Sequence, residues 1–299
     1  MRLVVTLIAA GPDRRLLPLA AAAGEALAIA AGPLWLAPEE ACDLFLDAPD
    51  PEAIAKTVRA VIGEAPVDIL VQPVAGRRKR LLVADLEATI IENEMLDELG
   101  AILGLGPEIA EITRRAMNGE IDFAAALAAR VALLTGTKMR VLAEAAARIR
   151  LTAGAQSLVA TTRRSGAMTA LVTGGFTIFA DRVAAELGFD RVVANRLEID
   201  GARLTGRVMP PIVTGETKRQ TLLALAAELG IAPGEAVAVG DGANDLPMLR
   251  AAGLGVAFHA KPFVAAAAHV HLDHADLTGL LSAQGYRKAD FAGSAAPQP

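Results

Sequence analysis

Aromatic residues are scarce in this sequence, at 3% of 299 residues. A surface that stacks successive nucleic-acid bases needs several aromatic side chains, so such a platform is not expected. The net charge of −5 and the lack of a long basic stretch argue in the same direction, since polyanion-binding surfaces are basic. We therefore expect no nucleic-acid partner.

Cysteine occurs only once, at Cys42. A single cysteine excludes an intramolecular disulfide framework and a cysteine-rich zinc site. No histidine-containing motif lies near Cys42, so we interpret it as a structural residue and not as a nucleophile.

Long apolar runs are also missing. Residues 19–32 come closest to the roughly 18 apolar residues of a membrane helix, and Glu25 interrupts them. Met1-Arg2 followed by the apolar residues 3–10 is compatible with a minimal signal peptide, but a first β-strand is the preferred interpretation. We expect a cytoplasmic protein with no membrane partner.

The first block of the sequence, residues 1–76, mixes strand and helix patterns. We predict strands at residues 3–10, 34–36, 42–46 and 68–74, an alanine-rich helix ending near residue 31, and a helix at residues 51–62. Asp50 is placed to cap that last helix and Pro51 to begin it. These elements predict a small α/β domain. The basic residues 77–80 are interpreted as a linker or a solvated entry to a strand.

The second block, residues 77–291, has a different pattern. Short apolar strands at residues 81–85, 170–173, 236–240 and 255–258 alternate with helices, and Asp200-Gly201 marks a hairpin around residues 199–204. Residues 93–150 are almost wholly helical, with breaks at 104–107, 119 and 135–136. This alternation predicts an α/β fold with a buried parallel sheet, whose ligands bind at the carboxyl ends of the strands. Residues 292–299 are expected to be a disordered tail.

Three of the predicted strands end in residues suited to catalysis. Asp85 and Glu87 follow the first, and one acid can attack phosphorus while a second transfers protons. Acids at a helix N-terminus are also common for structural reasons, so this pair alone leaves both interpretations open. Thr173-Gly174-Gly175 ends the second strand and can cradle phosphate with its hydroxyl and N–H groups, although a Gly-Gly pair is weak support.

The third strand runs into Gly240-Asp241-Gly242-Ala243-Asn244-Asp245. Two acids after a strand suit a hard cation such as Mg²⁺, which prefers carboxylates, waters and phosphate oxygens. Lys218 could offset the charge of phosphate and aspartate together, whereas a solvent-facing helix lysine is the more ordinary interpretation of this residue taken alone.

Taken in chain order, with Lys218 before residues 240–245, these four sets of residues resemble the signature of the haloacid dehalogenase superfamily of phosphatases. Within that superfamily the sequence is similar to the phosphoserine phosphatase family over residues 77–290. The similarity is carried by residues 85–99 (DLEATIIENEMLDEL), Asp122-Phe123, Arg130-Val131, residues 241–245 and residues 257–262 (AFHAKP). Residues 1–76 resemble, more weakly, the ACT-like regulatory domain that precedes the catalytic part in many bacterial members.

The resemblance implies a Rossmann-like core with an inserted helical cap over about residues 92–160. It implies Mg²⁺-dependent hydrolysis of O-phosphoserine through an aspartyl-phosphate, with a possible homodimer as the assembly. Asp85 would be the nucleophile and Glu87 the general acid/base. The metal ligands would be Asp85, the backbone carbonyl of Glu87 and Asp241, supported by Asp245. The residues implied to hold the substrate are Lys218, Thr173, Gly174, Gly175 and Asn244 for phosphate, Glu94 for the ammonium, Arg130 for the carboxylate, and Met117 and Phe123 for the pocket wall.

The sequence departs from the family pattern at three positions, where Glu87, Ala88 and Thr173 replace aspartate, serine and serine. Thr173 keeps the hydroxyl, but Glu87 carries one extra methylene, which moves its carboxyl group by about 1.5 Å unless the pocket compensates. If the pocket is otherwise that of the family, Glu87→Asp is expected to leave activity equal or higher. Two alternatives stay open: a phosphotransferase or a phosphatase for another small ester, and a catalytically weak phosphoserine sensor.

Overall fold

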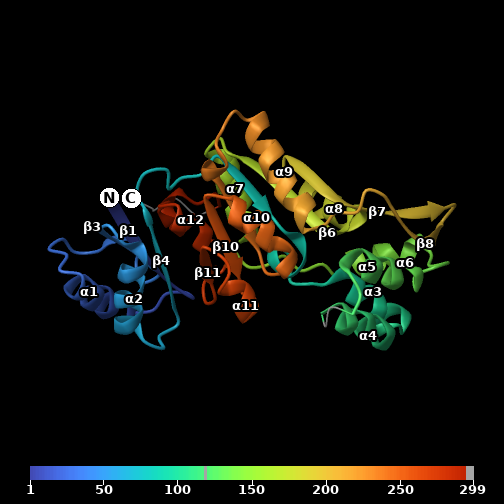
Figure 1. Ribbon diagram of the computed structural model, residues 1–299, viewed down its shortest axis with the longest axis horizontal. Coiled ribbons are helices and arrows are strands. Elements are labelled where there is room, and N and C mark those ends of the chain that lie inside the picture. The colour runs from blue at the N-terminus through green and yellow to red at the C-terminus, as the bar shows by residue number, and fades with distance from the viewer. Residues whose placement is uncertain (118–119, 294–299) are drawn as a thin grey trace.

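The computed structural model describes residues 1–117 and 120–293, without the side chain of Met117. Figure 1 shows a small blue module of residues 1–76 at one end, a central sheet covered by helices, and a green group of helices at the other end. The predicted tail falls mostly on residues 294–299, which lie outside the described part, as does Gly119. No helix within the described ranges is both long enough and apolar enough to cross a bilayer.

The N-terminal module contains one antiparallel sheet with strand order β2-β3-β1-β4. Its elements are β1 (Arg2–Ala9), α1 (Leu16–Ala26), β2 (Leu34–Ala37), β3 (Ala41–Asp47), α2 (Pro51–Ile62) and β4 (Val67–Pro73). This order is a split β-α-β motif. Helix α2 has the predicted bounds, because the Asp50 carboxylate accepts the Glu52 and Ala53 N–H groups at its first turn. Helix α1 ends five residues before the predicted limit at residue 31.

The central sheet has strand order β11-β10-β9-β5-β6-β7-β8, and every pair is parallel except β7–β8. Its strands are β5 (Leu81–Ala84), β6 (Met168–Phe176), β7 (Arg191–Asp200), β8 (Arg203–Met209), β9 (Ala236–Gly240), β10 (Leu254–Phe258) and β11 (Val270–Leu272). The predicted parallel α/β sheet is therefore confirmed. Strand β6 is longer than predicted and runs on through the two glycines to Phe176.

Helices cover both faces of this sheet, because alternate residues of its buried strands point to opposite sides. Leu82 of β5 belongs to the apolar cluster that includes Leu158 and Phe179, whereas Leu81 packs in the cluster that includes Leu222 and Met248. The helices of this region are α7 (Ala155–Arg164), α8 (Thr177–Leu187), α9 (Gly215–Glu228), α10 (Leu246–Ala251), α11 (Pro262–Ala265) and α12 (Gly279–Ala283).

The remaining helices are inserted between β5 and α7. They are α3 (Met95–Leu103), α4 (Gly106–Met117), α5 (Phe123–Ala132) and α6 (Met139–Ala146). A bridge between Ile91 and Leu151 joins the two chain segments that lead into and out of this insertion. The β7–β8 hairpin reaches over the inserted helices, where Lys138 forms a bridge with Arg203 (Figure 1). The insertion therefore contacts the core at its entry and at the hairpin.

The interpretation of residues 77–80 as a solvated linker is wrong for Arg77, whose side chain is only 9% exposed. Its guanidinium lies 2.6 Å from Asp43 Oδ2 and donates to the Thr6 hydroxyl and the Ala283 carbonyl. A buried arginine needs such partners, because an unpaired charge is costly away from water. The first residue of the connection thus ties the N-terminal module to α12.

Candidate active site

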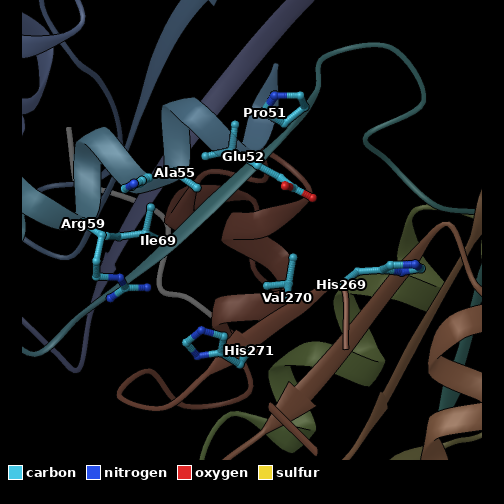
Figure 2. Close-up of a pocket in the computed structure, with 10 residues that line it drawn as sticks. Pro51, Glu52, Ala55, Arg59, Ile69, His269, Val270 and His271 are labelled. Carbon is cyan, nitrogen blue, oxygen red and sulfur yellow. The ribbon is translucent and has the colours of Figure 1, made fainter. Parts of the chain in front are cut away.

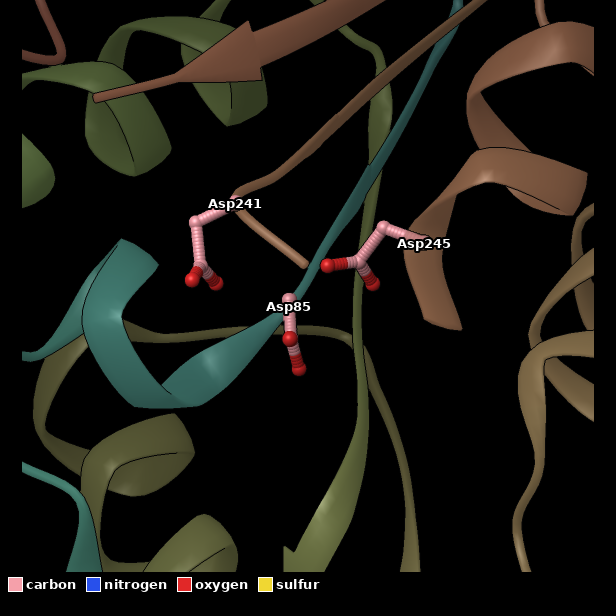
Figure 3. A group of neighbouring side chains, drawn as sticks. All are labelled: Asp85, Asp241 and Asp245. Atoms are coloured by element: carbon pink, nitrogen blue, oxygen red, sulfur yellow. The ribbon is translucent and has the colours of Figure 1, made fainter. Parts of the chain in front are cut away.

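Three adjacent strand ends meet at one edge of the central sheet, since β9, β5 and β6 are neighbours in its order. Asp85 follows β5 and Asp241 follows β9, as the sequence predicted. Asp245 joins them from the short turn Ala243–Asp245. Carboxylate oxygens of Asp85, Asp241 and Asp245 all lie within 4.8 Å of one another, and Figure 3 shows the three side chains converging.

Lys218 lies inside this group of acids, although its position on a helix gave no sign of burial. Its side chain is completely buried, and its Nζ lies 2.7 Å from both Asp85 Oδ1 and Asp245 Oδ1. Burial alone would lower the pKa of Lys218, but the ion pairs with Asp245 and Asp85 outweigh it and raise the pKa. Lys218 is therefore a fixed positive charge beside the strand ends.

The start of α9 determines where Lys218 points. The Thr214 hydroxyl accepts the Thr217 N–H, and the Thr217 hydroxyl accepts the Thr214 N–H. This reciprocal capping satisfies two N–H groups that the first turn would otherwise leave unpaired. The first turn, and with it Lys218, is held in place from outside the acidic group.

The carboxyl group of Glu87 is held by the start of the inserted helices. Met95 N–H donates to Glu87 Oε1 over 2.9 Å. Its other oxygen lies against Gly175, where a Cβ would come within 2.9 Å of Oε2. Burial, with a smaller contribution from the Asp85 charge, raises the pKa of Glu87 to about 7 against the opposing Met95 hydrogen bond. Near neutral pH this group can both donate and accept a proton.

The Thr173-Gly174-Gly175 segment is fixed by two hydrogen bonds. Gly175 N–H donates to the Thr173 hydroxyl over 2.9 Å, so this N–H is already engaged within the loop. The Gly174 carbonyl accepts from the Asn195 side chain over 2.8 Å. A Cβ at position 174 would lie 3.1 Å from the Phe123 ring, so the glycine allows Phe123 to pack this closely against the loop.

Asn195 is a residue that the sequence reasoning missed. It is fully buried on β7, donates to the Gly174 carbonyl, and accepts the Val213 N–H over 2.8 Å. It thereby joins the Thr173–Gly175 loop to the segment that leads into α9 and Lys218. A polar amide directly after the apolar residues 192–194 was a usable signal, since buried polar groups must find partners.

The other predicted substrate contacts surround this edge. Arg130 is half-buried on α5 and Glu94 is solvent-exposed just before α3. Burial lowers the pKa of Arg130, opposed by the charges of Glu87, Asp97 and Glu94. Burial by neighbouring atoms and then the Glu87 charge raise the pKa of Glu94 to about 8, even though its surface remains open to water. Arg130 and these acids therefore share one electrostatic environment.

Three more residues were predicted to contact the substrate: Phe123, Asn244 and Met117. Phe123, at the start of α5, is 36% exposed and lies over Gly174. Asn244 is half-buried, and its Oδ1 lies 2.3 Å from where a Cβ of Gly242 would be. The side chain of Met117 lies outside the described residues. The structure thus brings the predicted residues that it describes around one site, from both the core and the inserted helices.

Negative charge is in excess at this site. Two cations, Lys218 and Arg130, face six acids: Asp85, Glu87, Glu94, Asp97, Asp241 and Asp245. Burial and then the Asp85 charge raise the pKa of Asp241 and that of Asp245 to about 7. The donor atoms are all oxygens, which suits a hard divalent cation. The side chain of Glu87 is not part of the oxygen cluster, and its backbone carbonyl stays a predicted ligand.

Comparisons with known proteins agree with this geometry. The family model for haloacid dehalogenase-like hydrolases matches residues 82–250. A phosphoserine phosphatase from Archaeoglobus fulgidus is 42% identical over 235 residues, covering 78% of this chain and 68% of that protein. One from Lactococcus lactis is 44% identical over 203 residues, covering 68% of this chain and 94% of that protein. The crystal structure of a HAD-family hydrolase from Salmonella enterica superposes with a TM-score of 0.85 at 30% identity, covering 96% of this chain and 98% of that one.

Proposed function

The chain belongs to the haloacid dehalogenase-like hydrolase family and is a phosphoric monoester hydrolase; from that premise we propose that it hydrolyses O-phosphoserine to serine and phosphate, the last step of serine biosynthesis. The observation that carries the proposal is the buried contact of Lys218 with Asp85 and Asp245 at the strand ends. This contact leaves an aspartate beside a fixed cation, in a site to which the inserted segment adds Glu94, just before α3, and Arg130 of α5.

Asp85 is the proposed nucleophile. Its Oδ1 accepts the Leu86 N–H and pairs with Lys218, so Oδ2 is the oxygen left to attack phosphorus. The new Oδ2–P bond forms as the P–O bond to serine breaks, which leaves an aspartyl-phosphate. The serine oxygen takes its proton from the carboxylic acid of Glu87. In the second step, Glu87 takes a proton from water, and that water attacks phosphorus and releases Asp85 and phosphate.

The oxygen-only donor set fits Mg²⁺. Asp85, the carbonyl of Glu87 and Asp241 would hold it, with Asp245 in support because its oxygens already bind Lys218 and the Gly242 N–H. Bound Mg²⁺ supplies positive charge that offsets the carboxylates and the phosphate. The protein's own part is to keep these oxygens together and to keep Lys218 beside them.

The remaining proposed contacts fall into two groups, one for the phosphate group and one for the amino-acid part of the substrate. Thr173, Gly174, Lys218 and Asn244 hold the phosphate group. Gly175, the further residue expected here from the sequence, has its N–H engaged by the Thr173 hydroxyl, so its part is to leave room for the Glu87 carboxyl group. Arg130 reads the carboxylate, because a guanidinium can donate two parallel hydrogen bonds to it. Glu94 meets the ammonium group, and Phe123 and Met117 form the pocket wall. The Arg130 guanidinium forms no ion pair within the described part of the chain, which supports this role.

We also propose that residues 1–76 form an ACT-like module and residues 77–291 the catalytic domain, with the cap at about residues 92–160. The split β-α-β order of the first sheet supports the assignment of the N-terminal module. The four helices α3–α6 and their return at Leu151 support the assignment of the cap.

The test is phosphate release from O-phosphoserine with Mg²⁺, using Asp85→Asn as the blank. O-Phosphothreonine and an aryl phosphate measure selectivity for the amino acid. Release no faster than the blank would overturn the proposal. In that case, transfer of phosphate to an added alcohol would indicate a phosphotransferase, and tight phosphoserine binding without turnover would indicate a sensor.

A further inference from the structure

A cleft lies between the N-terminal module and the edge of the central sheet, with a volume of about 410 Å³. Its walls come from α2 on one side and from residues 269–271 at β11 on the other, and its apolar floor from β4 (Figure 2). Its lining includes Glu52, Lys56, Arg59, Ile69, Val71 and His271. None of them belongs to the catalytic site described above.

Two cations and one acid, Lys56, Arg59 and Glu52, line this cleft. Lys56 and Arg59 are exposed on one face of α2 and have no hydrogen-bonding or ion-pair partner among the described residues. Figure 2 shows Arg59 and His271 at one end of the cleft and Glu52 at the other. Asp273 engages His271 Nδ1 over 2.7 Å, so Nε2 is the nitrogen left for a ligand. An anion would therefore settle at the Arg59 end, away from the Glu52 carboxylate.

The floor of the cleft is apolar. Ile69 and Val71 lie two residues apart on β4, and so on the same face of that strand, and both are half-buried. Val270 adds an apolar contact from the opposite wall. A ligand with an apolar body would cover these side chains while its charged group reached Lys56 and Arg59.

A metal ion is not the matching ligand. Among the described residues, the only group of three or more potential metal-ligating side chains is Asp85, Asp241 and Asp245, so His269, His271 and Glu52 do not converge. The two free cations, with an imidazole nitrogen beside them, match instead a doubly charged anion. Guanidinium and ammonium groups bind phosphate by charge-assisted hydrogen bonds.

We propose that this cleft binds a small organic phosphate, with its phosphate group between Lys56, Arg59 and His271 and its apolar body over Ile69 and Val71. This site is separate from the catalytic one. Its ligand would bridge the two modules, because α2 and β4 belong to one and β11 to the other.

Histidine NMR provides the test, since the sequence has only four histidines and their ring signals can be assigned from single substitutions such as His271→Asn. The full-length protein would be titrated with phenylphosphonate, whose C–P bond it cannot hydrolyse as an ester, at fixed pH and ionic strength. We expect the His271 ring signals to shift and saturate. The double variant Lys56→Ala/Arg59→Ala should weaken this binding more than tenfold, because it removes both charge-assisted contacts to the phosphate group.

The matched control is Arg140→Ala/Arg182→Ala, which removes the same charge from exposed side chains outside the cleft and should leave the titration unchanged. Shifts that do not saturate, or that survive equally in both double variants, would show that the cleft holds no anion.

Inorganic phosphate is the second ligand. It should bind about tenfold more weakly, because it buries no apolar surface on the floor. Equal affinity for the two would overturn the organic part of the proposal.

Discussion

The extra methylene of Glu87 offers a sharp test of the proton-transfer step. The change Glu87→Gln keeps the length of the side chain and an oxygen that can still accept the Met95 N–H, so the group stays in place. It cannot donate or accept the catalytic proton. General acid/base catalysis contributes roughly 10²–10⁴-fold, so we expect turnover of phosphoserine to fall by about 100-fold or more.

The change Glu87→Asp tests position. Restoring the family's aspartate was expected from sequence to keep or raise activity, on the condition that the pocket is otherwise standard. The structure changes that condition, because Met95 N–H holds Oε1 at 2.9 Å and Oε2 lies against Gly175. Shortening the side chain by about 1.5 Å would lengthen the Met95 contact to roughly 4.4 Å, which is no hydrogen bond. Misplacement near 1 Å can cost roughly 100-fold, so we now expect Glu87→Asp to be slower than the parent.

The assay is steady-state phosphate release from O-phosphoserine with saturating Mg²⁺, together with p-nitrophenyl phosphate. The nitrophenolate leaves without needing a proton, so formation of the aspartyl-phosphate from this ester, measured in a single turnover, should suffer much less in Glu87→Gln. Glu92→Gln, an exposed acid ion-paired with Arg150, is the matched control and should be neutral. Full activity of Glu87→Gln would refute proton transfer by this residue. Higher activity of Glu87→Asp would refute the role of the Met95 contact.

Four further predictions concern the rest of the site. Asp85→Asn should abolish turnover, and a beryllofluoride adduct found crystallographically on any other residue would contradict its role as nucleophile. EDTA should abolish phosphate release and Mg²⁺ should restore it; undiminished activity in metal-free protein would contradict the metal site. Arg130→Lys should reduce kcat/KM for phosphoserine strongly and for p-nitrophenyl phosphate little, because a lysine cannot form the two-bond fork; equal losses would indicate a structural arginine. Asn195→Ala should lower the free energy of unfolding in urea by about 2–4 kcal/mol, since it leaves the part-buried Gly174 carbonyl and the buried Val213 N–H unpaired; unchanged stability would show that water replaces the amide.

Most of the fold could be predicted because its signals are local. The strand β9 has the predicted bounds, and β5 and β10 differ from prediction by one residue, since each is a short apolar run bounded by turn residues. Helix α2 also has the predicted bounds, because Asp50 caps its first turn and Pro51 begins it. Strand β6 was underestimated because its last residues are glycines and Phe176, which the pattern assigned to a turn.

The acids of the site were predictable for a related reason. Parallel strands place their carboxyl ends at one edge of the sheet, so a run of apolar residues followed by an acid already indicates which side chains will meet there. Asp85 and Asp241 follow this rule directly. The residues from the inserted helices did not follow from it, and Arg130 and Glu94 were identified only through the family resemblance.

Chain order and short-range pattern were thus enough for the α/β class, the strand ends and the acidic cluster, because apolar alternation and turn residues act over a few neighbours. Tertiary packing decided which polar side chains are buried and what holds them. Lys218 meets Asp245 across 27 residues, Asn195 meets Gly174 across 21, and Arg77 meets Ala283 across 206. A buried charge or amide persists only when its partners arrive from elsewhere in the chain, and no local window contains both members of such a pair.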